Sequence, residues 1–140
     1  MILADVNVLI HAFRPDAADH ALCREWLEGV VSGPANHGVS HQVLSSLIRV
    51  CTNPRAFVRP DRTEDVLSFC RALLRQPNAR VVSPGERHWE IFEDLCVRSA
   101  ATGNLVPDAW FAALAIESGC EWITLDRDYA RFPGLRWRTP

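Results

Sequence analysis

Short apolar runs alternate with segments of helical periodicity along the whole chain, and this alternation restricts the fold more than any other feature of the sequence. The apolar runs have the length of buried strands and lie at residues 2–5, 37–39, 80–82, 121–125 and 135–137, the last at a sheet edge. Helical spacing fills the intervals, at residues 6–14, 16–32, 40–53, 61–76, 83–101 and 107–118. Because strands that alternate with helices pair in parallel through right-handed crossovers, we predict an α/β/α sandwich around a central parallel sheet.

Four of the predicted helices carry a start signal. Asp16 and Ser40 stand where N-caps are expected, and residues 61–64 resemble a capping box. Residues 83–86 place Ser at the N-cap, Pro at N1 and Glu at N3. We therefore expect helices to begin at these four places.

Length and composition indicate a single domain covering residues 1–140, with enough hydrophobic content, 48%, for a proper core. No apolar stretch approaches the roughly 20 residues that cross a bilayer, and no basic segment precedes the first apolar run. We therefore expect a soluble, cytoplasmic protein. The five cysteines are odd in number, widely spaced and set in apolar segments, which favours core packing over disulfides or zinc binding.

The basic residues are unusual, because all fifteen are Arg and none is Lys. The missing Lys excludes a P-loop and Schiff-base chemistry, and the absence of a G-x-G-x-x-G segment argues against a nucleotide cofactor. A net charge of −2 would ordinarily argue against a nucleic-acid partner. Arg, however, binds phosphate through two parallel hydrogen bonds, so a local arginine rim remains compatible with such a partner.

Four aspartates stand where a parallel sheet would gather them. Asp5 ends the first strand, Asp108 opens an apolar helix, and Asp126 and Asp128 follow the fourth strand. Open α/β sheets bind ligands beyond the carboxyl ends of their strands. Carboxylates within ~4 Å repel by about 4 kcal/mol per pair at an effective dielectric near 20, which favours a bound cation. Because hard oxygen ligands prefer Mg²⁺ or Mn²⁺, we predict an acidic metal pocket.

Each of these acids also has a local structural alternative. Asp5 is placed to cap the helix that begins near Val6, and Asp108 lies in a first helical turn, where an acid suits the helix dipole. Asp126 and Asp128 are typical turn formers. The joint pattern favours the pocket over four separate structural roles.

The chain resembles the PIN-domain nucleases, and within them the toxin ribonucleases of VapBC toxin-antitoxin pairs. The resemblance covers the whole chain and is strongest at residues 5–10, 40–54, 104–109 with 112–115, and 124–132. It implies a three-layer α/β/α PIN-like domain with strand order 3-2-1-4-5. That order places the strand of Asp5 beside the strand that precedes Asp126.

Carried over onto this sequence, the resemblance implies that Asp5 and Asp108 are the principal Mg²⁺ ligands. Asp126 and Asp128 would complete the catalytic cluster directly or through bound water. The activity implied is Mg²⁺-dependent endoribonuclease cleavage, in which a metal-activated water hydrolyses an RNA phosphodiester bond and leaves 5′-phosphate and 3′-hydroxyl ends. The implied biological role is that of the toxin in a type II toxin-antitoxin pair.

Other residues fit supporting or substrate-binding roles. The resemblance gives polar supporting roles to Asn7 and Thr124. At the position of Ser46 the family usually has an acid, so this departure leaves open whether one or two metals bind. Arginines next to the motifs are candidate phosphate contacts, namely Arg14, Arg49, Arg127 and Arg131.

The partners implied are the RNA substrate, a cognate antitoxin protein that covers the cleft, and a second copy of the chain in a homodimer. Exposed aromatic residues would suit such contacts, although residues at helical spacing are more often core; the candidates are Phe13, Trp26, Phe57 and Trp137.

Two other functions remain open from the sequence. The first is a noncatalytic RNA-binding or partner-binding module with a weakened metal site, which Ser46 makes plausible. The second is a phosphohydrolase or receiver-like phospho-acceptor that uses Asp5 as nucleophile. The absence of Lys argues against the second, because those families use a lysine near the phosphoryl group.

Overall fold

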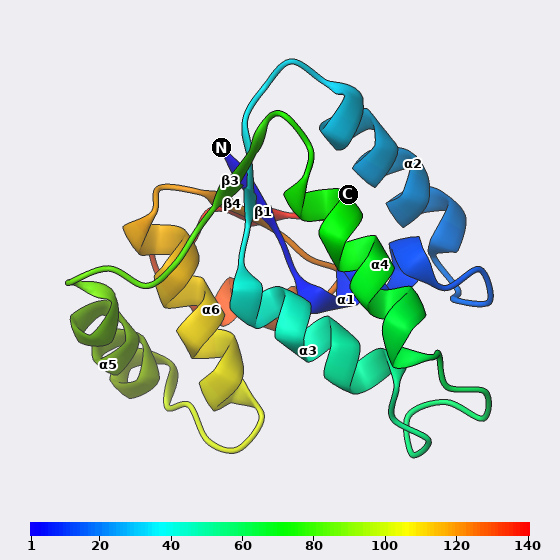
Figure 1. Ribbon diagram of the computed structural model, residues 1–140. Coiled ribbons are helices and arrows are strands. Elements are labelled where there is room, and N and C mark those ends of the chain that lie inside the picture. Colours follow the sequence, from blue (N-terminus) through cyan, green and yellow to red (C-terminus); the bar gives the residue numbers. More distant parts are fainter.

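In the computed structural model, which describes residues 1–140, five short strands form one parallel sheet. The strands are β1 (Ile2–Ala4), β2 (His37–Val39), β3 (Ala79–Val81), β4 (Glu121–Ile123) and β5 (Trp137–Arg138). Their order in the sheet is β3-β2-β1-β4-β5, which confirms the predicted order (Figure 1). Since β1 pairs directly with β4, Ala4 lying opposite Ile123, the residues that follow these two strands emerge side by side.

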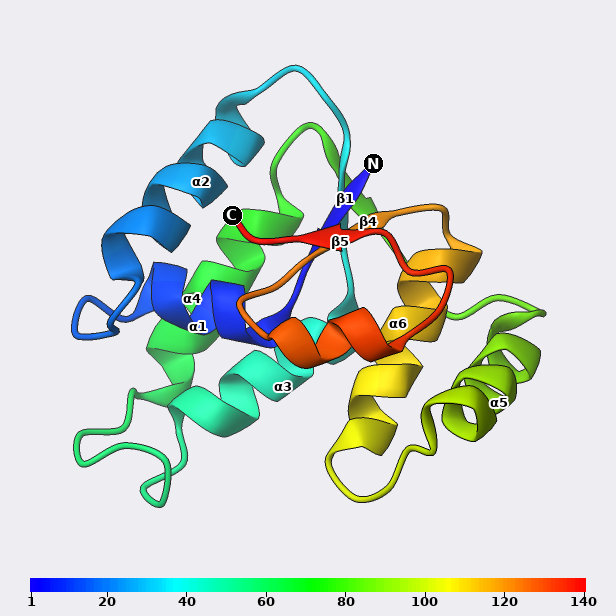
Figure 2. The same cartoon turned by 180° about the vertical axis from the view of Figure 1, so that it is seen from behind.

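Six α-helices form the outer layers, and a 3-10 helix, η1 (Arg127–Arg131), follows β4. The α-helices are α1 (Val6–Phe13), α2 (His20–Ser32), α3 (His41–Cys51), α4 (Thr63–Leu74), α5 (His88–Ser99) and α6 (Leu105–Glu117). Helices α1 to α4 lie on one side of the sheet, and α5 and α6 lie on the other (Figures 1 and 2). The chain reverses its direction across the sheet between β3 and β4, so a right-handed crossover there places α5 and α6 on the opposite face.

The cysteines confirm the predicted core packing. Four of the five cysteines are buried and all five are free thiols. Gly38 in β2 is required by close packing, because a Cβ there would approach the Val82 side chain to 3.0 Å and the Ile2 carbonyl oxygen to 3.1 Å. None of the six α-helices combines the length and the apolarity that a membrane crossing requires.

The helix start predicted at Asp16 is wrong, whereas the start predicted at residues 61–64 is confirmed, although Asp61 does not cap that helix. Helix α2 begins at His20 and α4 at Thr63. The carboxylates of Asp16 and Asp61 instead accept hydrogen bonds from the guanidinium of Arg14, at 2.9 Å and 2.6 Å. Asp61 therefore pairs with Arg14, which lies 47 residues earlier in the sequence, and does not cap a local helix.

The start predicted at residues 83–86 is also wrong, since α5 begins at His88. The carboxylate of Glu117, at the end of α6, accepts hydrogen bonds from the backbone N–H groups of Gly85 and Arg87, at 2.7 Å and 2.9 Å. The carboxylate of Glu117 therefore accepts the backbone N–H groups before α5, the capping role that the sequence predicts for Ser83. Of the predicted caps, Ser40 does occupy the N-cap position of α3, although its hydroxyl makes no capping bond.

The aromatic residues considered for partner contacts pack within the molecule. Phe13, Trp26 and Trp137 are partly buried against the core, and the ring of Phe13 lies 5.1 Å from that of Phe69. The ring of Phe57 lies under the guanidinium of Arg14.

Candidate functional site

Asp5 follows β1 directly and serves as the N-cap of α1. One carboxylate oxygen, Oδ1, accepts the backbone N–H of Val6 at 2.6 Å, which confirms the local capping role. The other oxygen, Oδ2, accepts the hydroxyl of Thr124 at 2.6 Å and the amide of Asn7 at 2.9 Å. Asp5 is only 5% exposed. Its orientation is therefore held by three donors from two neighbouring strand ends.

Asn7 and Thr124 form the bridge between the two strand ends. The amide Nδ2 of Asn7 also donates to Thr124 Oγ1 at 3.1 Å, and its oxygen accepts the backbone N–H of Leu125 at 3.1 Å. Thr124 Oγ1 in turn accepts the backbone N–H of Asp126 at 3.0 Å. This network fastens the segment after β4 to the segment after β1.

Asp108 and Asp126 approach Asp5 from α6 and from the turn after β4. Asp108 lies in the first turn of α6, and its Oδ1 accepts the hydroxyl of Tyr129 at 3.4 Å. Asp126 caps η1, because its Oδ1 accepts the backbone N–H of Asp128 at 2.8 Å. Both acids thus have a local structural role and still face the same pocket.

A polar pocket of about 270 Å³ brings these side chains together. Its lining comes from α1, α3, α6 and the turns after β1 and β4, and comprises Asp5, Val6, Asn7, Ile10, Ser46, Arg49, Pro107, Asp108, Phe111 and Asp126. Asp128 lies outside this lining. Its side chain is 63% exposed and faces Arg131, with Asp128 Oδ1 3.6 Å from Arg131 Nε.

The charges in the pocket repel one another. Burial raises the pKa of Asp5 to about 6, the hydrogen bonds from Thr124 and Val6 oppose the rise, and the charges of Asp108 and Asp126 add to it. Burial also raises the pKa of Asp108, with further contributions from Asp126 and Asp128. The acids are close enough to disfavour full ionisation, which a bound cation would relieve.

The donor set fits a hard divalent cation only in part. Three carboxylates and the hydroxyl of Ser46 line one pocket, and oxygen donors of this kind suit Mg²⁺ or Mn²⁺. No three His, Cys, Asp or Glu side chains, however, lie together closely enough to hold a metal as they stand. Metal binding would therefore require Asp108 or Asp126 to turn toward Asp5, or water to fill the remaining positions.

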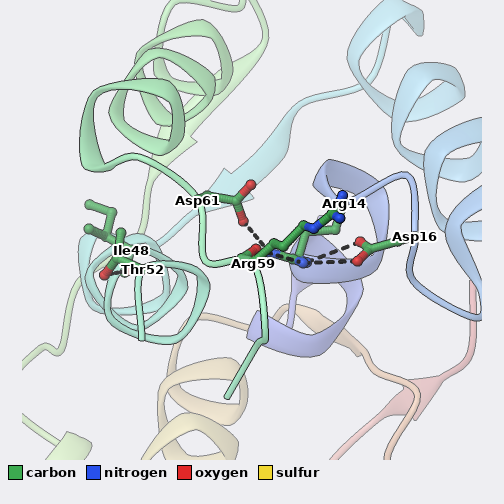
Figure 3. Close-up of polar contacts among 6 residues, drawn as sticks. All are labelled: Arg14, Asp16, Ile48, Thr52, Arg59 and Asp61. Atoms are coloured by element: carbon green, nitrogen blue, oxygen red, sulfur yellow. Dashed lines mark hydrogen bonds and ion pairs between the residues drawn. The ribbon is translucent and has the colours of Figure 1, made fainter. Parts of the chain in front are cut away.

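The four arginines that we considered as phosphate contacts lie in different surroundings. Arg49 lines the acidic pocket from α3. Arg127 is exposed and makes no side-chain hydrogen bond or ion pair, and Arg131 pairs with Asp128. For Arg14 the prediction is corrected, because its guanidinium is buried, is paired with Asp16 and Asp61 (Figure 3), and is not part of the pocket lining.

Tyr129 is the site residue that the sequence reasoning missed. Its side chain is buried beside Trp122 and Phe132, and its hydroxyl donates to Asp108. Burial, reinforced by Asp5 and Asp108, raises the pKa of its phenol, so the hydroxyl stays protonated and remains a donor. The signal was present in the sequence as a Tyr one position after Asp128, within the segment already singled out.

Comparison with known proteins adds an independent finding. A profile of the PIN domain family matches residues 2–135. VapC ribonuclease Mb2897 of Mycobacterium bovis is 42% identical over 140 residues, which cover all of this chain and 95% of that protein. Ribonuclease VapC25 of Mycobacterium tuberculosis is 38% identical over 140 residues, covering all of this chain and 99% of that protein.

Solved structures share the fold at lower sequence identity. VapBC2 from Rickettsia felis, bound to a DNA fragment from its promoter, aligns with a TM-score of 0.73 and 17% identity, covering 99% of this chain and 98% of that one. VapC20 of Mycobacterium tuberculosis, a Sarcin-Ricin loop cleaving toxin, aligns with a TM-score of 0.65 and 17% identity, covering 97% and 99%. At these identities the likeness concerns the fold.

Proposed function

The chain belongs to the PIN domain family, and from this membership together with the acidic pocket we propose that it is an endoribonuclease, the toxin of a type II toxin-antitoxin pair. The observation that carries the proposal is the convergence of Asp5, Asp108 and Asp126 on one pocket at the carboxyl edge of the sheet. Relatives of nearly equal length carry the name ribonuclease, which supports the same activity.

We propose that Asp5, Asp108 and Asp126 hold Mg²⁺ or Mn²⁺, with Asp128 acting at most through water. A divalent metal bound there would polarise the scissile phosphate and lower the pKa of a water molecule. Hydrogen bonds from Asn7 and Thr124 keep the carboxylate of Asp5 oriented, and those from Thr124 and Val6 lower the cost of its ionisation. This preorganisation means that the main acidic ligand needs no rearrangement when RNA arrives.

The remaining pocket residues suit the substrate. Arg49 is the single basic side chain in the lining, so we propose that it contacts the phosphate next to the scissile bond. Ser46 contributes a neutral hydroxyl where the family usually has an acid, which favours one tightly bound metal over two. The products would carry 5′-phosphate and 3′-hydroxyl ends.

Use of Asp5 as a phosphoryl acceptor is less compatible with the site. The chain has no Lys at all, so no lysine can stabilise a phosphoryl group transferred to Asp5.

The partners proposed are the RNA substrate, an antitoxin and a second copy of the chain in the cytoplasm. Support for the antitoxin comes from the fold neighbours, which include complexes such as VapBC2 of Rickettsia felis and FitAB. An antitoxin that inserts a basic residue into a pocket lined by three carboxylates would relieve their repulsion, as a metal would.

A second candidate function is a noncatalytic RNA-binding or partner-binding module. Two observations favour it: Ser46 removes one acid, and no three acids lie at metal-binding distance. Incubation of the purified protein with structured and single-stranded RNA in Mg²⁺, Mn²⁺ or EDTA separates the two functions. Metal-dependent cleavage that is lost in Asp5→Ala and Asp108→Ala supports the nuclease, whereas metal-independent RNA binding without cleavage supports the module.

A further inference from the structure

The connection between α3 and α4, residues 53–62, forms a compact loop that projects beyond both helices (Figures 1 and 2). Its two ends are joined, because the backbone N–H of Asp61 donates to the carbonyl of Cys51 at 2.8 Å. At its beginning, the side chain of Asn53 accepts the backbone N–H of Arg55 at 2.9 Å. We refer to residues 53–62 as the arginine loop.

Arg14 fixes the arginine loop to the end of α1. The guanidinium donates to Asp61 Oδ2 at 2.6 Å and, through both terminal nitrogens, to the carbonyl oxygen of Arg59 at 3.3 Å (Figure 3). The carbon of the guanidinium lies 3.7 Å from the centre of the Phe57 ring. Arg14 is only 5% exposed, so the loop is held at three points by a buried cation. A loop anchored in this way is pre-organised for binding.

The arginine loop and the end of α3 that leads into it carry exposed arginines without an acidic partner. Seven of the fifteen arginines have no side-chain hydrogen bond or ion pair, and four of these seven fall within 14 consecutive residues, at Arg49, Arg55, Arg59 and Arg62. All four are exposed. The single acid of the loop, Asp61, is already paired with Arg14.

The arginine loop also adjoins the acidic pocket. Ile10 and Arg49 line the pocket. Each lies four residues before a residue that anchors the loop: Ile10 before Arg14, which follows α1, and Arg49 before Asn53, which follows α3. Four residues correspond to about one helical turn, roughly 5–6 Å. Helices α1 and α3 therefore both run from the pocket lining to the anchorage of the arginine loop.

We propose that the arginine loop is a phosphate-binding subsite, in which Arg55, Arg59 and Arg62 hold the backbone of a single-stranded segment of RNA that extends from the acidic pocket. This inference rests on the proposed function for the identity of the ligand. Exposed guanidiniums without an acidic partner on an anchored loop, with Arg49 between them and the pocket, suit the repeated negative charges of a polynucleotide backbone. Val58, which is fully exposed at the loop, is placed to contact a base.

A matched pair of variants tests the subsite. Arg55→Gln/Arg59→Gln removes two charges from the arginine loop while leaving the carbonyl of Arg59 to bind Arg14. Arg75→Gln/Arg87→Gln removes the same charge from exposed, unpaired arginines outside the loop. Binding of fluorescein-labelled U12 RNA is followed by anisotropy in EDTA across a range of salt concentrations, with gels confirming that the RNA stays intact and thermal melting confirming the fold.

The loop variant is expected to bind U12 more weakly than the control and to lower the slope of log affinity against log salt by about 1.4. That figure corresponds to two lost phosphate contacts at roughly 0.7 each for a single strand. Equal slopes in the two variants would overturn the inference. So would a loop variant that keeps RNA binding but loses binding of a decaglutamate peptide, since the surface would then serve an acidic protein.

The two proposals fail separately. If the protein binds U12 through the loop but cleaves no RNA, the subsite stands and the nuclease assignment fails. If the protein cleaves RNA in a metal-dependent reaction and the two variants bind and cleave alike, the nuclease assignment stands and the subsite fails.

Discussion

Thr124 donates a 2.6 Å hydrogen bond from its hydroxyl to Oδ2 of Asp5, across a separation of 119 residues in the sequence. The bond joins the residue that follows β4 to the residue that follows β1, and these two strands pair directly in the sheet. It lowers the pKa of a carboxylate whose pKa burial raises, so Thr124 adjusts the charge state of the main acidic residue of the site. The site's chemistry thus depends on a side chain that does not itself line the pocket.

Removal of the Thr124 hydroxyl should raise the pKa of Asp5 further. We expect Thr124→Val, which keeps the shape of the side chain, to shift the acidic limb of the pH profile for RNA cleavage upward by roughly one unit, because a hydrogen bond to a charged group contributes about 1.5 kcal/mol. Thr124→Ser keeps the hydroxyl and serves as the control. A uniform loss of activity without a shift of the profile would contradict this role.

Asp5 should make the unfolding free energy fall as the pH rises. Its pKa is 3.8 in the unfolded chain and about 6 in the folded protein, so the folded state binds the proton more tightly between these values. Ionisation of Asp5 therefore lowers the unfolding free energy by about 2 to 3 kcal/mol. This loss is absent below pH 4 and complete above pH 6. Urea unfolding in EDTA at pH 4 and pH 7 should show this loss in the wild type and not in Asp5→Asn; an equal change in both would refute it.

The two principal acids should be essential for cleavage, and Asp128 should not be. We expect Asp5→Asn and Asp108→Asn to lower the cleavage rate by at least about 100-fold, since each removes a charge from the pocket. Asp128→Asn should lose no more than about tenfold, because its side chain is exposed and lies outside the lining. Equal losses in all three variants would show that Asp128 acts directly.

Ser46→Glu should strengthen metal binding. The side chain at position 46 lines the pocket from α3, so an added carboxylate would complete a set of four acids around it. We expect the Mn²⁺ concentration for half-maximal cleavage to fall roughly tenfold, corresponding to about 1.4 kcal/mol. Ser46→Gln controls for side-chain length, and a metal requirement that the two variants share would argue against the assignment of this position.

Arg14 should contribute to stability rather than to catalysis. Arg14→Ala leaves the partly buried Asp61 without its partner and releases the arginine loop, and we expect the unfolding free energy to fall by about 2 kcal/mol. Arg24→Ala, which breaks an exposed pair with Glu28, should cost less than about 0.5 kcal/mol. Urea unfolding at pH 7 measures both, and equal costs would contradict the structural role of Arg14.

The sequence by itself determined the parallel sheet, its three layers and three of the acids that line the pocket. These follow from local information, because strands and helices differ in the period of their apolar residues and because Asp5 and Asp126 stand directly beyond strands that the family pattern pairs. Placement of an acid at a strand end already decides which edge of the sheet its side chain faces.

Only the tertiary structure decided which partner each charged side chain takes. Asp16 and Asp61 were expected to cap local helices, yet both bind Arg14, and the backbone before α5 is bound by Glu117, for which the sequence analysis made no prediction. Arg14 was expected at the substrate and lies instead beneath the arginine loop. The physical reason is that a carboxylate gains about as much from any nearby donor, so distances in the folded chain, and not spacing along it, select the donor.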